Sequence, residues 1–327
     1  MEQAPTAAQH AREMVVEHLR IQLAGDAEAR RITLGDGTSL SFDLLSIATG
    51  GEVDCSSLAE LGDRLLPVRP MHDLVARWPT IVEAARSTPG FRLIVVGGGA
   101  AGVELSLAAQ RALAQHHCPP VMLVSDEPEL LAGHDAHAGI LARNRLDQAG
   151  VQLVIDYALG APEGVRLSDG STISAGCVIA ATGPKPPRWL RGAGLRLDDE
   201  GFLAVGADLR SVSHPHVFGA GDIAGGIDNR RSHNLTRSGV HAVRAGPILA
   251  ENLRRALRDP RAPMRRYRPR RRSLYLISTA DGRAILSWGR LVLSGRWAQR
   301  LKDRIDRRFV AGYQRLGAAG EGVAWTR

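Results

Sequence analysis

Three glycines at a fixed spacing, Gly97, Gly99 and Gly102, mark the place where this sequence could bind a phosphate group. They follow an apolar run at 92–96 and precede a stretch with helical periodicity at 100–115. A strand, a Gly-x-Gly-x-x-Gly turn and a helix, in that order, make up the fingerprint of a dinucleotide-binding βαβ unit. The spacing and its context together predict a nicotinamide-dinucleotide site at this turn.

Each glycine of the fingerprint has a separate physical task. Gly97 permits the tight turn, Gly99 lets the backbone approach a diphosphate because it has no Cβ, and Gly102 lets the helix lie close to the strand. The N-terminus of the helix then presents unpaired N–H groups and a partial positive charge to the phosphates. Gly98 and Ala101, which lie within the same turn, are expected to contact the nucleotide as well.

Two acidic residues near the turn could contribute to the same site. In this fold an acid after the second strand binds the ribose 2′-OH of NAD. The second strand, 121–124, is followed by Ser125 and Asp126, so Asp126 is the candidate, one residue late, with a solvated loop acid as the alternative. No arginine follows to hold a 2′-phosphate, which favours NADH over NADPH. Glu104 could reach the nicotinamide end or cap the start of the helix.

The surrounding pattern predicts an α/β protein with a doubly wound sheet and inserted hairpins. Ala48-Thr49-Gly50 and Ala181-Thr182-Gly183 each follow an apolar strand and look like internal equivalents. We expect the long helix that follows the strand at 214–224 to be capped by Asn234 or Thr236. The expected strands and hairpins lie at 30–42, 43–51, 92–96, 121–124, 151–158, 165–174, 177–186, 214–224 and 273–289, and the expected helices at 72–87 (interrupted at Pro79), 100–115, 234–257 and 295–316.

Composition and charge exclude several classes of protein. The chain has 327 residues and three cysteines, Cys55, Cys118 and Cys177, too far apart in sequence for a C-x-x-C redox pair or a Cys/His metal site. The net charge is +8, and ten arginines lie between Arg254 and Arg272. We interpret that segment as a solvated connector and expect no nucleic-acid partner, because no stacking aromatics interleave with the arginines.

Taken together, these motifs resemble the pyridine nucleotide–disulfide oxidoreductase superfamily, whose members have two dinucleotide-binding domains. Within it the chain looks like the type II NADH dehydrogenases, and above all like the NADH dehydrogenase-like flavoproteins that are sometimes fused to selenide, water dikinase. The resemblance covers about residues 30–315. It is carried by the two Ala-Thr-Gly turns, the Gly97–Gly102 fingerprint with Glu104, the element 217–222 with Gly221 and Asp222, the run 238–242, and the C-terminal stretch 274–309.

The resemblance implies FAD and NAD(P)H as cofactors. It implies that Asp222 binds the ribityl chain of FAD, with Thr49, Gly50 and Gly221 beside the flavin nucleotide, and that the helix after Asp222 points its N-terminus at the pyrimidine edge of the flavin. It places Thr182 and Gly183 at the nicotinamide nucleotide.

The sequence departs from the family at its start. Family members begin with a strand and a Gly-x-Gly-x-x-Gly turn for the FAD diphosphate, and residues 1–50 contain no such motif. We interpret the sequence as starting late relative to the natural protein, with an incomplete first domain. The expected domains are the remainder of an FAD-binding domain at 1–70, an NAD(P)H-binding domain at 71–185, a return to the FAD-binding domain at 186–258, and a basic connector with a small α+β region at 259–327.

The expected activity is FAD-dependent NADH dehydrogenation without a redox disulfide, with a quinone or another small acceptor and no catalytic acid or base that the sequence identifies. The alternative is a non-enzymatic NAD(P)-binding remnant. In the C-terminal helix Trp297, Leu301, Ile305 and Phe309 form one stripe. We expect this stripe to pack on its own domain, with an interfacial membrane contact as the alternative. The expected location is the cytoplasm, or the inner face of the membrane if that contact forms.

Overall fold

The computed structural model describes residues 24–116, 118–226, 237–270 and 272–320, with side chains of the last helix up to residue 312. The chain divides into two compact units. One holds the described residues up to Glu52 and those from Pro184 to 270, and the other runs from Val53 to Gly183 and from Arg272 onward. The proposed caps Asn234 and Thr236 lie outside the described residues, and the prediction that one of them caps the helix is wrong, because α6 (Gly239–Arg258) begins after Ser238.

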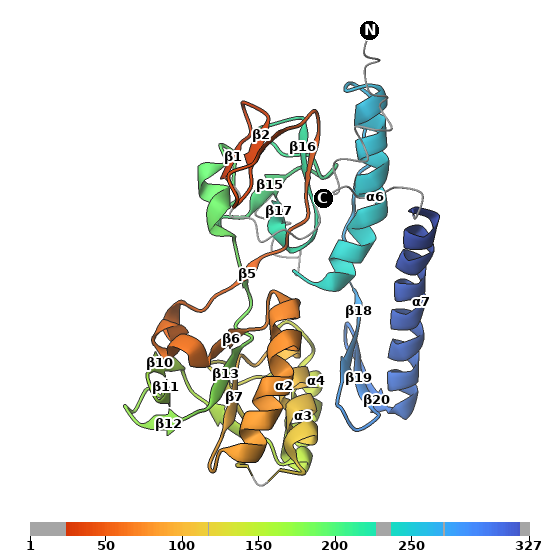
Figure 1. Ribbon diagram of the computed structural model, residues 1–327. Helices are drawn as coiled ribbons and strands as arrows, with labels where there is room; N and C mark the ends of the chain where they lie inside the picture. The colour runs from red at the N-terminus through yellow and green to blue at the C-terminus, as the bar shows by residue number, and fades with distance from the viewer. Residues whose placement is uncertain (1–23, 117, 227–236, 271, 321–327) are drawn as a thin grey trace. The chain divides into compact units, whose positions relative to one another are not determined.

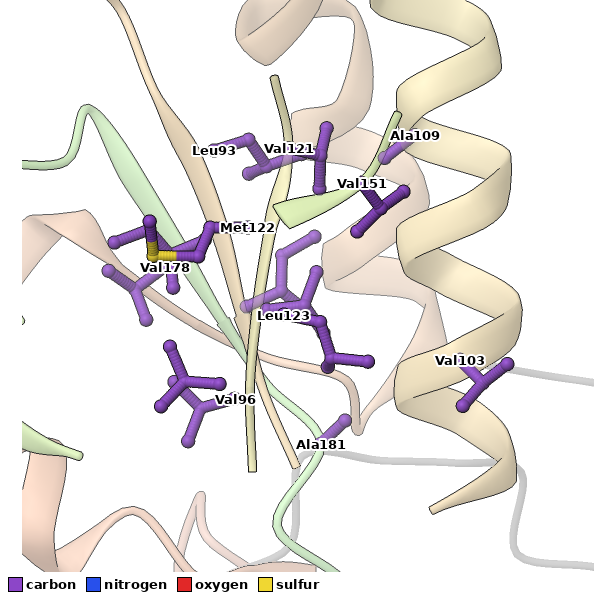
Figure 2. Packing of buried hydrophobic residues seen from close by; sticks show 14 of the residues in the cluster. Leu93, Val96, Val103, Ala109, Val121, Met122, Leu123, Val151, Val178 and Ala181 are labelled. Atoms are coloured by element: carbon purple, nitrogen blue, oxygen red, sulfur yellow. The ribbon is translucent and has the colours of Figure 1, made fainter. Parts of the chain in front are cut away.

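The second unit is built on a parallel five-stranded sheet with the order β6-β13-β7-β8-β9. These strands are β6 (Leu65–Pro67), β13 (Cys177–Ala180), β7 (Leu93–Val96), β8 (Met122–Ser125) and β9 (Gln152–Ile155). β7, β8 and β13 are buried along their whole length, as expected for central strands of a parallel sheet that is covered on both faces. Figure 2 shows the side chains of Leu93, Met122, Leu123 and Val178 packed in this core. The predicted α/β fold is confirmed.

Three helices belong to this sheet: α2 (Met71–Ser87), α3 (Ala100–Leu113) and α4 (Ala136–Ala149). The predicted interruption at Pro79 is wrong, because α2 runs through it. Proline removes one backbone donor from a helix. Here the buried residues Leu74, Ile81 and Ala85 lie on both sides of Pro79 and hold the two halves of the helix against the core.

Short elements complete the second unit. The 3₁₀ helix η1 (Ser56–Arg64) packs on the sheet edge, and β10 (Leu159–Ala161), β11 (Gly164–Arg166) and β12 (Thr172–Ser174) form an antiparallel sheet of three strands. β11 and β12 are the predicted hairpin at 165–174.

The C-terminal residues of the second unit form an antiparallel sheet and a long helix. The strands are β18 (Leu274–Ser278), β19 (Ala284–Trp288) and β20 (Leu291–Gly295), and α7 (Arg296–Gly320) follows. The predicted hairpin ended at residue 289 and did not include β20. The residues of β20 pair along the whole of β19. Figure 1 shows α7 running alongside these strands.

This sheet is covered on both faces. Ile277, Ile285 and Val292 join the core of the dinucleotide-binding sheet, whereas Leu286 on the opposite face packs with Ala298 of α7. Of the predicted stripe on α7, Leu301 packs in the same cluster, but Trp297, Ile305 and Phe309 are 46%, 44% and 42% exposed. The stripe as a whole is therefore not buried. No helix in the described part of the chain is both long and apolar enough to cross a membrane.

The first unit contains a parallel pair of strands, β4 (Leu45–Ile47) and β16 (Val217–Gly219). Helix α6 (Gly239–Arg258) packs near β16 through a cluster that includes Phe218, Ala245 and Leu249. The predicted hairpin at 30–42 is present as β2 (Arg31–Thr33) and β3 (Ser39–Ser41), with β1 (Ala24–Asp26) added at its edge.

Small elements fill the rest of the first unit. A parallel pair joins β15 (Leu203–Val205) to β17 (Ala224–Gly226), and the 3₁₀ helices are η2 (Arg188–Gly192) and η3 (Gly221–Ile223). The chain passes between the two units through β5 (Glu52–Val53) and β14 (Pro184–Lys185), which pair with each other.

The arginine-rich segment is anchored through its backbone. The side chain of Asn252, fully buried in α6, donates to the carbonyls of Asp208 and Arg265 at 2.8 and 2.9 Å and accepts from the Arg265 amide at 2.8 Å. The Tyr267 amide donates to the carbonyl of Ala207 at 2.6 Å. The guanidinium groups of Arg265, Arg266 and Arg268 stay at the surface, as expected for a connector with a solvated charged face.

Candidate functional site

The glycine turn forms the sharp connection between β7 and α3. Gly97 has a φ of +122°, which a residue with a side chain rarely adopts, and its amide donates to the carbonyl of Val124 at 2.8 Å. A Cβ on Gly97 would lie 2.3 Å from the carbonyl oxygen of Ala181. A Cβ on Gly102 would lie 1.8 Å from the carbonyl oxygen of Gly97. Both positions must therefore stay free of a side chain for the turn to close.

Gly99 differs from its neighbours because the space above it is open. A Cβ at Gly99 would meet no atom within 4 Å, and the residue is exposed. Gly99 precedes the first residue of α3, and the first backbone bond of the helix runs from the Val103 amide to the Gly99 carbonyl at 3.0 Å. The amides of Ala100, Ala101 and Gly102 consequently have no partner in the helix itself. The backbone is open to solvent here, and the binding of a diphosphate at this turn stays a prediction.

Gly98 is held by the loop after β8 rather than turned toward the open side. A Cβ on Gly98 would lie 2.3 Å from Ser125 Oγ, and the Gly98 carbonyl accepts from the Leu131 amide at 2.9 Å. The Ser125 hydroxyl in turn donates to the carbonyl of Glu127 at 2.9 Å. Ser125 and Leu131 thus support the turn from behind. Neither residue could be identified from the spacing of the glycine motif, because both lie in the loop after the next strand.

β8 extends one residue further than predicted, through Ser125. Asp126 is therefore the first residue after the strand, and it is exposed. This places a free carboxylate at the carboxyl edge of the sheet, on the strand next to the glycine turn. The assignment of Asp126 to the ribose stays a prediction.

Glu104 lies inside the helix and not at its start. It is the fifth residue of α3, and its Oε1 accepts a hydrogen bond from the Ser278 amide of β18 at 2.7 Å. The predicted capping role is wrong, since Glu104 is one turn past the free amides. Burial raises the pKa of the Glu104 carboxyl above its usual value, against the lowering effects of the Ser278 amide and Lys302. Its contact with nicotinamide stays a prediction.

A second contact joins the loop after β8 to the C-terminal sheet. His134 Nδ1 lies 3.0 Å from Ser287 Oγ, and the His134 ring packs edge-on against Tyr275 with centroids 4.8 Å apart. Burial lowers the pKa of His134, which favours the neutral ring. Glu104 and His134 thus fasten β18 and β19 beside the glycine turn. These pairs are 174 and 153 residues apart in sequence, and nothing local could have indicated them.

The turn at Thr182 and Gly183 lies at the end of β13, the strand next to β7. Thr182 Oγ1 donates its hydroxyl hydrogen to the carbonyl of Asp54 at 2.6 Å. This hydrogen is therefore not available to donate to a ligand. Gly183 has a φ of +94° with open space around the position of a Cβ. The open backbone at Gly183 is therefore a better candidate for a contact with the nicotinamide nucleotide than the Thr182 hydroxyl.

In the first unit, two of the expected flavin turns lie side by side. The Ala220 amide donates to the carbonyl of Ile47 at 3.2 Å, so the residues that follow β4 and β16, Thr49-Gly50 and Gly221-Asp222, leave the same edge of this pair. A Cβ on Gly221 would lie 3.5 Å from Ala242 in the first turn of α6. Asp222 is 9% exposed. The structure therefore brings these two turns to the same edge of the strand pair, with Gly221 beside α6.

None of the cysteines forms a disulfide. Burial raises the pKa of the Cys177 thiol to about 11, which keeps it protonated at neutral pH. In the described residues no cluster of acids, histidines or cysteines is arranged to hold a metal ion.

The Gly99→Val variant tests the open face of the turn. We expect its dissociation constant for NADH to rise at least about tenfold, because the branched side chain would occupy the approach to the free amides. Its melting temperature should stay close to that of the parent, because no atom lies near the new Cβ. Titration of NADH by fluorescence, with a thermal melt of the same sample, measures both.

The matched control is Gly192→Val, another glycine with an open Cβ position, which should leave NADH affinity unchanged. Gly102→Ala should instead destabilise the protein, because its Cβ would overlap the Gly97 carbonyl. Unchanged NADH affinity in Gly99→Val would remove the assignment of this turn to the diphosphate.

The Glu104→Gln variant tests the buried carboxyl. Because the pKa is raised in the folded state, ionisation of Glu104 costs stability as the pH rises above about 4.5 and through the folded pKa. Glutamine keeps an acceptor for Ser278 and carries no charge. We expect Glu104→Gln to be more stable than the parent at neutral pH and equal to it in mild acid, as measured by urea unfolding at several pH values.

The control is Glu104→Ala, which leaves the Ser278 amide unpaired. It should be less stable than Glu104→Gln by about 1 to 3 kcal/mol at every pH. A stability difference between parent and Glu104→Gln that does not change with pH would contradict the account.

Comparisons with known proteins agree with this geometry. The family model described as pyridine nucleotide-disulphide oxidoreductase matches residues 4–246. An NADH dehydrogenase-like protein of Mycobacterium tuberculosis is 29% identical over 226 residues, which are 64% of this chain and 55% of that protein. The ferredoxin–NAD(+) reductase component of the p-cumate 2,3-dioxygenase system of Pseudomonas putida is 34% identical over 206 residues, 61% of this chain and 48% of the other.

Solved structures show the same fold. The sulfide:quinone oxidoreductase of Aquifex aeolicus superposes with a TM-score of 0.65 at 16% identity, over 88% of this chain and 72% of the other. The covalent putidaredoxin reductase–putidaredoxin complex gives a TM-score of 0.62 at 20% identity, over 82% of this chain and 63% of the other. The chain spans about half the length of the curated relatives it matches. The family model covers most of the chain, including the glycine turn and both Ala-Thr-Gly turns. The chain therefore belongs to the pyridine nucleotide-disulphide oxidoreductase family.

Proposed function

We propose that this chain acts in an FAD-dependent NADH dehydrogenase. FAD and NAD(P)H are the cofactors of the family. The observation that carries the proposal is the open backbone at Gly99, beside the first-turn amides of α3. When both cofactors are bound, they supply the hydride transfer, and the protein has to bind and orient them.

The nicotinamide nucleotide would be held by the second unit. The amides of Ala100, Ala101 and Gly102 would donate to the diphosphate, and the positive end of the α3 dipole would favour its charge. Asp126 would accept from the ribose 2′-OH, and its charge would repel the 2′-phosphate of NADPH. We therefore propose NADH as the preferred nucleotide, with Gly183 on the neighbouring strand close to the same edge.

The flavin nucleotide would be held by the first unit. Asp222 lies at the carboxyl end of β16, where its carboxylate could accept hydrogen bonds from sugar hydroxyls, with Thr49 and Gly50 at the end of the paired strand. The N-terminus of α6 begins beside Gly221 and would favour negative charge on the ring system. These residues fit the sugar and ring of FAD, but the described residues up to Glu52 contain no glycine-rich turn for its diphosphate.

The thiols support electron transfer that does not pass through a disulfide. Cys177 is buried in β13, and its raised pKa disfavours the thiolate. Cys55 and Cys118 are half-buried, and neither forms a disulfide. The electrons would then leave the flavin directly for an external acceptor.

We propose a quinone as the acceptor. The relatives named as ferredoxin–NAD(+) reductases favour a second candidate, a small iron–sulfur protein. A panel of a soluble quinone, a ferredoxin and an artificial dye, each with NADH as the donor, separates them. A colourless protein that still binds NADH would favour the alternative of a non-enzymatic nucleotide-binding protein.

The Asp222→Ala variant tests the flavin part of the proposal. We expect bound FAD and NADH-driven dye reduction each to fall by about tenfold or more, because a buried hydrogen-bonding carboxylate is lost. NADH affinity should not change, since its contacts are in the other unit. Flavin absorbance per chain and NADH titration give the two readouts, with exposed Asp43→Ala as the control. Full flavin content in Asp222→Ala would count against the assignment.

A further inference from the structure

Strand β9 is the last strand of the five-stranded sheet in the second unit. It pairs with β8, and in the part of the chain that the structure describes no strand pairs with its other edge. We infer that this open edge binds a second copy of the chain, with β9 of one copy antiparallel to β9 of the other. The two sheets then form one continuous sheet across a two-fold axis. The pairing does not depend on the proposed function, because none of its residues belongs to the proposed nucleotide sites.

The hydrogen bonds of β9 show which backbone groups face the open edge. The amides of Gln152 and Asp156 donate to carbonyls on the β8 side, at 2.9 and 2.8 Å. Along a strand, successive residues direct their N–H and C=O groups to opposite sides. The backbone groups of Leu153 and Ile155 therefore point away from β8. An unpaired edge of this kind offers its donors and acceptors to another strand.

These groups define a register that a two-fold axis can use. In an antiparallel pair, two residues that face each other exchange both of their N–H···O bonds. An axis at Val154 places Leu153 opposite the partner's Ile155 and Ile155 opposite the partner's Leu153. Both pairs then exchange their bonds, and the Val154 side chains of the two copies lie next to each other. Every outward-facing backbone group of β9 is thereby paired.

β9 lacks the features that usually protect an edge strand. Its four residues, Gln152–Ile155, include no charged residue and no proline. The valine and isoleucine in it favour strand pairing. Ile155 is 40% exposed, whereas every residue of the neighbouring strand β8 is buried. A second strand at this edge would partly cover Ile155.

Helix α4 borders the same edge and leaves room for a partner. A groove of about 560 Å³ lies between them, lined by Arg143, Asn144 and Asp147 of α4 and by residues 150–153. Spacings of three and four residues place these helical side chains on one face. Ile140 lies three residues before Arg143, on the same face, and is 55% exposed. This face of α4 is therefore available to a molecule that docks on β9.

Two charges on that face make it complementary to itself. Arg143 and Asp147 are both exposed, and the Arg143 guanidinium donates to the Pro128 carbonyl at 3.0 Å, which holds it beside the groove. The end of α4 is fixed at the start of β9, since the Val151 amide donates to the Leu146 carbonyl at 2.9 Å. A two-fold axis reverses the order of the two charges along the edge, so Arg143 of each copy faces Asp147 of the other. This match selects a second copy, because a uniformly acidic or basic partner would satisfy only one of the two charges.

Charge reversal of these residues tests the choice of partner. We expect the full-length chain to form a concentration-dependent dimer in sedimentation velocity. Arg143→Glu or Asp147→Arg should raise the dissociation constant of that dimer at least about tenfold, because like charges then face each other. The double variant Arg143→Glu/Asp147→Arg should return it to within about threefold of the parent value. Arg166→Glu, an exposed charge on β11, is the control and should have no effect.

The Ile155→Pro variant tests the strand pairing itself. Proline has no N–H, and the N–H of Ile155 points away from β8, so the hydrogen bonds within the sheet are kept. We expect this variant to stay monomeric, with a melting temperature in dilute solution close to that of the parent. Ile155→Val keeps the N–H and should dimerise as the parent does.

Hydrogen exchange by NMR adds a readout at single amides. Exchange at Leu153 and Ile155 should be fast in the dilute monomer and about a hundredfold slower in the dimer, because cross-strand bonds protect amides. Slow exchange in the monomer would overturn the inference, since another part of the chain would then cover the edge. A chain that is monomeric at every concentration would overturn it too. So would a dimer that Ile155→Pro and Arg143→Glu leave unchanged, because it would form through another surface.

Discussion

The contact between Gly97 and the carbonyl of Ala181 is the constraint on which the rest of the second unit depends. It brings the end of β7 against the end of β13 so closely that no side chain fits between them. The turn that results points the free amides of α3 toward the carboxyl edge of the sheet, where open α/β sheets bind their ligands. Gly102 then allows the helix to start directly after the turn, because any side chain at this position would overlap the Gly97 oxygen.

The two units differ in their parallel strands. The second unit has a complete parallel sheet around its Ala-Thr-Gly strand, whereas the described part of the first has only the strand and one neighbour. Asp222 and α6 lie beside β16, the strand that pairs with β4.

Local signals carried much of the fold. The strand before Gly97, the turn and the helix after it were predictable, since apolar runs and glycine spacing are properties of neighbouring residues. The role of Glu104 was not, because its partner Ser278 lies 174 residues away. β6 was missed because it is a short strand whose partner β13 lies far along the chain, and β20 because only Val292 among its residues is buried. Of the site, the glycines were predictable, but the loop behind Gly98 was not.

The most direct measurement is an NMR titration of the protein with NADH, following backbone amide shifts. The account predicts that the largest shifts occur at Ala100, Ala101 and Gly102, and that inorganic pyrophosphate moves the same three amides. If saturating NADH leaves these amides in place and shifts a different region of the chain, the diphosphate does not bind at the start of α3, and the account of this site is wrong.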